Sequence, residues 1–185
     1  ALHFFANHEL LAIEMMAAAL MKFSTTVHPN IFAKISKGIF CTLRDEQKHL
    51  KLYMERMSDF GVSFGDFPVN DFFWRRVNKM KSFSDYFSLI SLTFEAANLD
   101  FCKYYRTLFS TLGDIQTSEI LDQIYKDEVS HVDLGVYWLN NWKQDKTLWN
   151  YYRESLPLDI SPARAKGIGF SPENRMDTLL DSKFI

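Results

Sequence analysis

The chain has 185 residues, of which 47% are hydrophobic and 24% are charged. This balance is typical of one globular domain with a sizeable core, and it excludes collagen-like, disordered and low-complexity proteins. The net charge of -2 argues against binding of nucleic acid through a strongly basic surface. Cys41 and Cys102 are too few for a disulfide framework, so we expect reduced thiols and a cytoplasmic protein.

The N-terminal segment does not resemble a signal peptide, because no basic residue precedes its apolar residues and His8 and Glu9 follow soon after them. Charged residues interrupt every long apolar stretch, so we expect no transmembrane helix. The chain begins with Ala1 rather than Met and has no helix cap there. We therefore expect further sequence to precede Ala1.

Two helices are predicted in the first part of the chain. Residues 3–23 carry apolar side chains at helical spacing without Gly or Pro. Pro29 marks a break, after which residues 31–60 are predicted as a second helix that ends at Gly61. Residues 61–81 mix turn-forming and aromatic residues, which indicates an unusually long crossover.

The second part of the chain repeats the arrangement. We predict a third helix from about Ser84, a plausible N-cap, to Leu112, and a fourth from Asp114 to about Lys143. A short helix at 147–155 and a tail rich in Pro and Gly follow. Two short-looped helix pairs joined by one long crossover predict an all-α, ferritin-like four-helix bundle over 1–145, with the short helix and irregular tail of 146–185 packed on it.

The pattern Asp-Glu-x-x-His occurs twice, at residues 45–49 and 127–131, once in each helix pair. Residues three apart lie on one face of a helix, so Glu46 and His49 can reach the same point, as can Glu128 and His131. A bundle interior tolerates such polar groups only when they are paired. A metal ion would pair them.

Single glutamates in the other two helices could complete a metal site. Glu95 is a lone carboxylate within an apolar stretch of the third helix. In the first helix Glu9 and Glu14 are about 140° apart around the axis, so only one of them can face a given point. Four carboxylates and two imidazoles are the ligand set of a dinuclear carboxylate site, which suits iron or manganese rather than zinc held by thiolates.

Several residues beside these motifs are candidates for supporting roles. Asp45 and Asp127 could orient the imidazoles four residues further on, although a simple surface role is an equal alternative. Tyr53 and Tyr125 each lie one turn from a motif, where a redox or supporting phenol is conceivable but a core tyrosine is favoured. We assign no catalytic residue outside the metal ligands.

The run Glu9-Leu10-Leu11-Ala12-Ile13, together with Glu95 and the two Asp-Glu-x-x-His motifs, resembles the ferritin-like superfamily. The run is similar to the first helix of bacterioferritin-type proteins, in which its glutamate is a metal ligand. This resemblance implies that Glu9, rather than Glu14, is the ligand. The implied ligand set is Glu9, Glu46, His49, Glu95, Glu128 and His131.

More closely, the chain resembles the bacterial "domain of unknown function 455" family over nearly its whole length. The segments that carry this resemblance are His8–Glu14, Asp45-Glu46 with His49, Phe64–Pro68, Glu95-Ala96 with Leu99-Asp100, Asp127–Val129 with His131-Val132, and Pro162–Gly167 through Arg175. The resemblance implies the fold and the metal site, but no particular reaction. Because Glu14 belongs to the shared motif, a supporting or exchanging role for it stays open.

These features predict a protein that binds two iron ions, or manganese or a mixed Mn/Fe pair, and activates O2 to oxidise or hydroxylate an unknown substrate with an electron donor. The alternatives are iron handling, as a ferroxidase or peroxide scavenger, and a non-catalytic metal-binding bundle. A homodimer is compatible with this interpretation, and a membrane partner is not expected. The basic, aromatic stretch Trp74–Lys81 leaves nucleic acid open as a partner, although solvated charges on a crossover are the favoured explanation.

Overall fold

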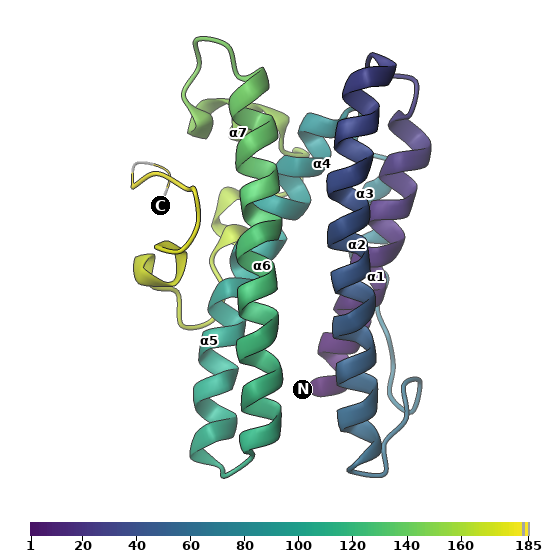
Figure 1. Ribbon diagram of the computed structural model, residues 1–185, viewed down its shortest axis with the longest axis vertical. Coiled ribbons are helices and arrows are strands. Elements are labelled where there is room, and N and C mark those ends of the chain that lie inside the picture. The colour runs from purple at the N-terminus through teal and green to yellow at the C-terminus, as the bar shows by residue number, and fades with distance from the viewer. Residues whose placement is uncertain (183, 185) are drawn as a thin grey trace. The chain divides into compact units, whose positions relative to one another are not determined.

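The computed structural model describes residues 1–182 and 184, and within that part of the chain every regular element is a helix (Figure 1). The predicted all-α class is therefore confirmed. The chain divides into two compact units, Ala1–Ser82 and Phe83–Ile185. Each unit is built around a pair of long helices.

In the first unit, α1 (Leu2–Phe23) and α2 (Pro29–Ser58) pack against each other as a helical hairpin (Figure 1). Pro29 occupies the first turn of α2, where its missing N–H is not needed. The Nδ1 atom of His28 caps this turn by accepting a hydrogen bond from the Asn30 N–H at 3.3 Å. Both helices begin and end within two residues of the predicted ranges.

The crossover after α2 lies along α1 and contains a short helix, α3 (Trp74–Val77), that the sequence did not indicate. Its contacts follow α1 in chain order: His3 stacks on Phe64, Asn7 Oδ1 accepts a hydrogen bond from the Asn70 N–H, and Lys22 donates to the Val77 carbonyl. The aromatic residues of this segment range from Phe73, which is buried, to Phe67, which is largely exposed although its ring edge meets His3 of α1. Docking on α1 explains how so long a connection stays ordered.

The second unit begins with three consecutive helical segments and ends with a loop-rich tail. Its elements are α4 (Phe83–Leu89), the π-helical segment η1 (Ile90–Glu95), α5 (Ala96–Thr111), α6 (Ile115–Trp142), α7 (Leu148–Ser155), and the 3-10 turns η2 (Pro162–Ala165) and η3 (Pro172–Arg175).

The predicted continuous α-helix from Ser84 to Leu112 is wrong in two respects. It begins at Phe83, so Ser84 lies inside the first turn and does not cap it; the Ser84 hydroxyl instead forms a hydrogen bond with that of Tyr151 at 2.8 Å. Six residues in its middle are π-helical. The reversal at Gly113, which has a φ of 81°, and the cap at Asp114 agree with the prediction.

A buried ion pair fastens the tail to α5. The Arg175 guanidinium donates to both carboxylate oxygens of Asp100, at 2.8 and 2.7 Å, and to the Ala96 carbonyl at 2.9 Å. Asp100 also accepts hydrogen bonds from the Gly167 N–H and the Asn174 amide. The tail therefore adds a buried polar anchor to the same helix that follows Glu95.

By length and composition α1 could cross a membrane, which differs from our expectation that no such segment exists. The difference arises because the mean hydropathy of α1 is high enough despite its isolated polar residues, although α1 contains no unbroken apolar run of about 20 residues. Buried core helices and signal sequences satisfy the same criterion. α1 is apolar because much of its surface is buried, including Ala6, Met15, Met16 and Ala19.

Candidate metal centre

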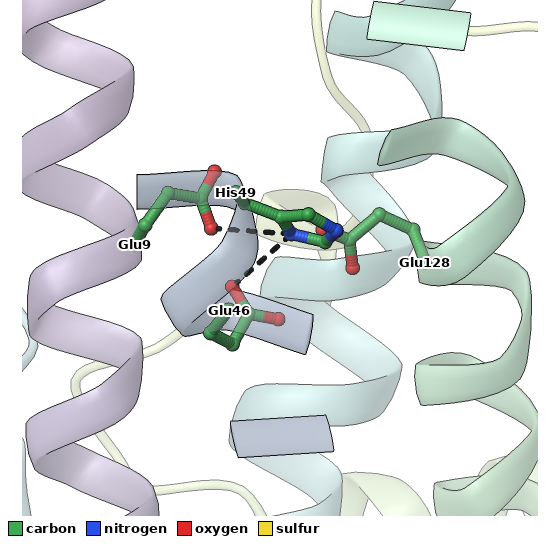
Figure 2. A group of neighbouring side chains, drawn as sticks. All are labelled: Glu9, Glu46, His49 and Glu128. Atoms are coloured by element: carbon green, nitrogen blue, oxygen red, sulfur yellow. Dashed lines mark ion pairs between the residues drawn. The ribbon is translucent and has the colours of Figure 1, made fainter. Parts of the chain in front are cut away.

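Three side chains of the first unit form a buried group, which we call the Glu9 cluster: Glu9 of α1 with Glu46 and His49 of α2. Each offers one ligand atom, and these atoms lie within 4.8 Å of one another. The Nδ1 atom of His49 is 3.8 Å from Glu9 Oε2 and 3.7 Å from Glu46 Oε2, as the dashed lines of Figure 2 mark. Since metal–ligand bonds of about 2 Å place two ligands of one ion at most about 4 Å apart, the cluster could hold an ion after a small closure.

The electrostatics of the Glu9 cluster favour a cation. Burial, and then the neighbouring Glu46 carboxylate, raise the pKa of Glu9 well above its ordinary value. The side chains of Glu9 and Glu46 are 5% and 1% exposed, so two carboxylates share a site that water barely reaches. A bound cation would remove their mutual repulsion and favour the ionised form of Glu9.

The second unit contains a matching group, the Glu95 cluster: Glu95 of η1 with Glu128 and His131 of α6. Its three ligand atoms also lie within 4.8 Å of one another, and all three residues are buried. Glu128 Oε2 and His131 Nδ1 are 3.1 Å apart. The two units thus carry the same combination, a Glu-x-x-His pair on one helix and a single glutamate on its neighbour.

The π-helical segment determines which face of its helix carries Glu95. A π turn contains an extra residue, so it rotates the side chains that follow relative to a continuous α-helix, and such segments are frequent at functional sites. Glu95 is the last residue of η1. The Thr93 side-chain hydroxyl donates to the Ser88 carbonyl at 2.8 Å, which ties η1 to the preceding helix α4.

The first-helix candidates are placed in different environments. Glu9 is 4% exposed and lies within its cluster, whereas Glu14 is exposed on α1. The angle of about 140° between them accounts for this difference. The structure thus brings together all six residues of the expected ligand set in two groups of three, one in each unit, and Glu14 belongs to neither.

The expected supporting residues make contacts of several kinds. Asp45 and Asp127 are half-buried, and Asp127 accepts a hydrogen bond from Gln123 on its own helix at 3.0 Å. Tyr53 is buried with its ring 5.5 Å from that of Phe5, as in an ordinary core. Tyr125 donates its hydroxyl to the Asp177 carboxylate at 3.0 Å, and burial raises its pKa to about 12.

Asn98 is a further residue at the Glu95 cluster that the sequence motifs did not predict; its side-chain amide donates to Glu128 Oε1 at 2.8 Å. The signal was present as Glu95-Ala96-Ala97-Asn98, in which a second polar residue follows the glutamate by one helical turn. Because a neutral amide is not an ionisable metal ligand, the ligand motifs alone do not single out Asn98.

The fold and these clusters define an all-helical protein with buried carboxylate and imidazole groups that could bind metal ions. The chain belongs to the DUF455 family, described as a protein of unknown function, whose sequence model matches residues 1–185. It is also 25% identical over 140 residues to an uncharacterized protein of Haemophilus influenzae. That match covers 74% of this chain and 49% of the relative, so the chain spans about half of the relative's length. No solved structure matches this chain.

Proposed function

We propose that the Glu9 and Glu95 clusters are the two halves of one dinuclear metal site, formed when the two helix pairs pack together as a ferritin-like four-helix bundle. The observation that carries this proposal is the repetition of one donor set in both units. Each cluster supplies one single glutamate and one Glu-x-x-His pair, which together make the ligand set of the di-iron and di-manganese carboxylate proteins.

The charge and the donor atoms of the clusters favour the binding of two metal ions. Each cluster buries two carboxylates beside an imidazole, and holding two like charges close together away from water is costly. Oxygen-rich sets with one imidazole per ion suit iron or manganese. Three protein residues would hold each ion, which would leave room for a small molecule to bind there.

The function that this site supports best is activation of O2 for the oxidation or hydroxylation of a substrate. The metal pair would supply the redox chemistry, while the chain supplies position and exclusion of water. Glu9, Glu46 and His49 would hold one ion, and Glu95, Glu128 and His131 the other. Because all six are buried, bulk water would have little access to the reacting centre.

The test is an anaerobic titration of the purified chain with Fe²⁺, followed by O2 in limiting amounts, with absorbance and O2 uptake recorded together. We expect O2 uptake that requires about two Fe²⁺ per chain and is lost in Glu9→Gln and Glu128→Gln. Glu14→Gln is the matched control on α1, and it should behave as wild type. Metal binding without O2 uptake would favour a non-catalytic bundle.

Excess Fe²⁺ separates oxygenation from iron handling. Continued oxidation of many Fe²⁺ per chain would identify a ferroxidase, whereas oxidation that stops once the bound ions are consumed supports an oxygenase that awaits its substrate and electron donor. Rapid reaction of the reduced protein with hydrogen peroxide, but not with O2, would instead identify peroxide scavenging.

A further inference from the structure

Asn98 links the two long helices of the second unit at the Glu95 cluster. It lies on α5 one turn after Glu95, and its Nδ2 donates to Glu128 Oε1 on α6 at 2.8 Å. The second oxygen of Glu128 lies 3.1 Å from His131 Nδ1. Both oxygens of this buried carboxylate therefore have a defined neighbour.

The orientation of the Asn98 amide follows from its partner. A carboxylate only accepts hydrogen bonds, so the NH2 group rather than the carbonyl of Asn98 must face Glu128. A hydrogen bond to an ionised acceptor is shorter and stronger than one between neutral groups. Rotation of the Glu128 carboxylate would break this bond, so Asn98 holds the carboxylate plane fixed.

We propose that Asn98 is a positioning residue that presents Glu128 to the metal, an inference that rests on the proposed metal site. Hydrogen-bond partners of ligands commonly fix ligand direction, and their loss weakens metal binding by about 10–100-fold. The continuous segment of η1 and α5 then serves the cluster twice: η1 carries Glu95, and α5 carries Asn98, which orients Glu128. The pattern Glu-x-x-Asn on this helix parallels the Glu-x-x-His of α6.

The alternative is that Asn98 merely joins α5 to α6. The chain offers a matched control for it in the same unit. Asn174 Nδ2 donates to Asp100 Oδ1, also at 2.8 Å, but Asp100 pairs with Arg175 and belongs to neither cluster. Loss of either asparagine removes one amide–carboxylate hydrogen bond, but only the bond of Asn98 is made to a proposed metal ligand.

The experiment compares wild type, Asn98→Leu and Asn174→Leu, since leucine is close to asparagine in shape but cannot donate. Fe²⁺ affinity is measured anaerobically by competition with a chromogenic chelator, and the metal-free proteins are compared by thermal unfolding. We expect Asn98→Leu to bind one of its two ions about 10–100-fold more weakly than wild type does, while Asn174→Leu binds both ions as wild type does. The two metal-free variants should have similar thermal stability. If Asn98→Leu does not fold, Asn98→Ala serves in the same comparison.

Equal affinity in wild type and a folded Asn98 variant would overturn the positioning role and leave the metal site intact. An equal weakening in Asn174→Leu would also overturn it, because the effect would then be one of general stability. Failure of the wild type to bind Fe²⁺ would overturn the proposed function and this inference together. Recovery of affinity in Asn98→Gln, which restores a donor, would further support it.

Discussion

The hydroxyl groups of Thr93 and Tyr152 are 2.9 Å apart in the core of the second unit. Thr93 donates its single hydroxyl proton to the Ser88 carbonyl, so Tyr152 must be the donor to Thr93. This chain of hydrogen bonds connects α7 to the π-helical segment that ends at Glu95. The stability of α7 is thereby coupled to the backbone that aims a proposed metal ligand.

Replacement of Tyr152 by Phe tests this connection. We expect Tyr152→Phe to lower the free energy of unfolding at pH 7 by about 1 kcal/mol, because Thr93 loses its donor. The variant should also bind metal more weakly, since η1 becomes less rigid. Urea unfolding and Fe²⁺ titration measure the two effects, and unchanged metal affinity would show that α7 does not influence the site.

Titration of Tyr152 should make the free energy of unfolding depend on pH. Burial raises the pKa of Tyr152 to about 12 from its ordinary value of 10.0. A raised folded-state pKa contributes stability that is complete below pH 10 and is lost as pH rises toward 12, on the order of 2 kcal/mol. Wild type should therefore lose stability more steeply than Tyr152→Phe between pH 10 and 12, and parallel curves would contradict this assignment.

Glu9→Gln should separate stability from metal binding. Because the pKa of Glu9 is raised in the folded chain, its contribution to stability is present below the ordinary glutamate value of 4.5 and is lost as pH rises. Metal-free Glu9→Gln should therefore melt higher than metal-free wild type at pH 8, but not at pH 4, and should bind less metal. Glu14→Gln should change neither property; a lower melting temperature for Glu9→Gln would show that ionised Glu9 is not destabilising.

Gly135→Ala should disturb the second unit at η1. A Cβ atom at Gly135 of α6 would lie 2.4 Å from Ser91 Cβ and 2.6 Å from Leu92 Cδ1. Both neighbours belong to the π-helical segment, so the helices must move apart, at a cost of about 1–3 kcal/mol. Chemical denaturation measures the loss, and a variant as stable as wild type would show that η1 yields freely.

Arg175→Met should detach the tail from α5. It leaves Asp100 buried without its guanidinium partner, and breaking a buried pair costs about 3–5 kcal/mol. The double variant Asp100→Leu with Arg175→Met should recover most of this loss, because it also removes the isolated charge. Urea unfolding and limited proteolysis of the tail test both expectations. If the double variant recovers no stability, the loss comes instead from the hydrogen bonds that Arg175 donates to the carbonyls of Ala96 and Ala165.

The helix pattern and the two Glu-x-x-His pairs could be predicted from the sequence because they depend on local spacing. Glu46 and His49 share a face whatever surrounds them. Pro29 and Gly113 mark helix ends through their backbone conformation, and Asp114 does so through its side-chain cap. The choice between Glu9 and Glu14 required a resemblance to other proteins, since either residue satisfies the spacing.

Features that depend on packing could not be predicted in this way. The π-helical segment has no distinctive composition. Its residue Thr93 forms a hydrogen bond with Tyr152, which lies 59 residues further along the chain. Asn98 and Arg175 owe their roles to partners 30 and 75 residues away. The short helix α3 lies in a segment whose turn-forming residues favoured an irregular loop, and its docking on α1 overrides that preference.

A single dinuclear site is tested most directly by loading the metal-free chain with Mn²⁺ and measuring both the stoichiometry and the electron paramagnetic resonance spectrum. We expect about two Mn²⁺ per chain with an exchange-coupled signal, because ions in one dinuclear site lie about 3.5–4 Å apart. Glu46→Gln and Glu128→Gln should each reduce the stoichiometry and abolish the coupling. One ion per chain, or two ions with independent signals, would contradict a single dinuclear site.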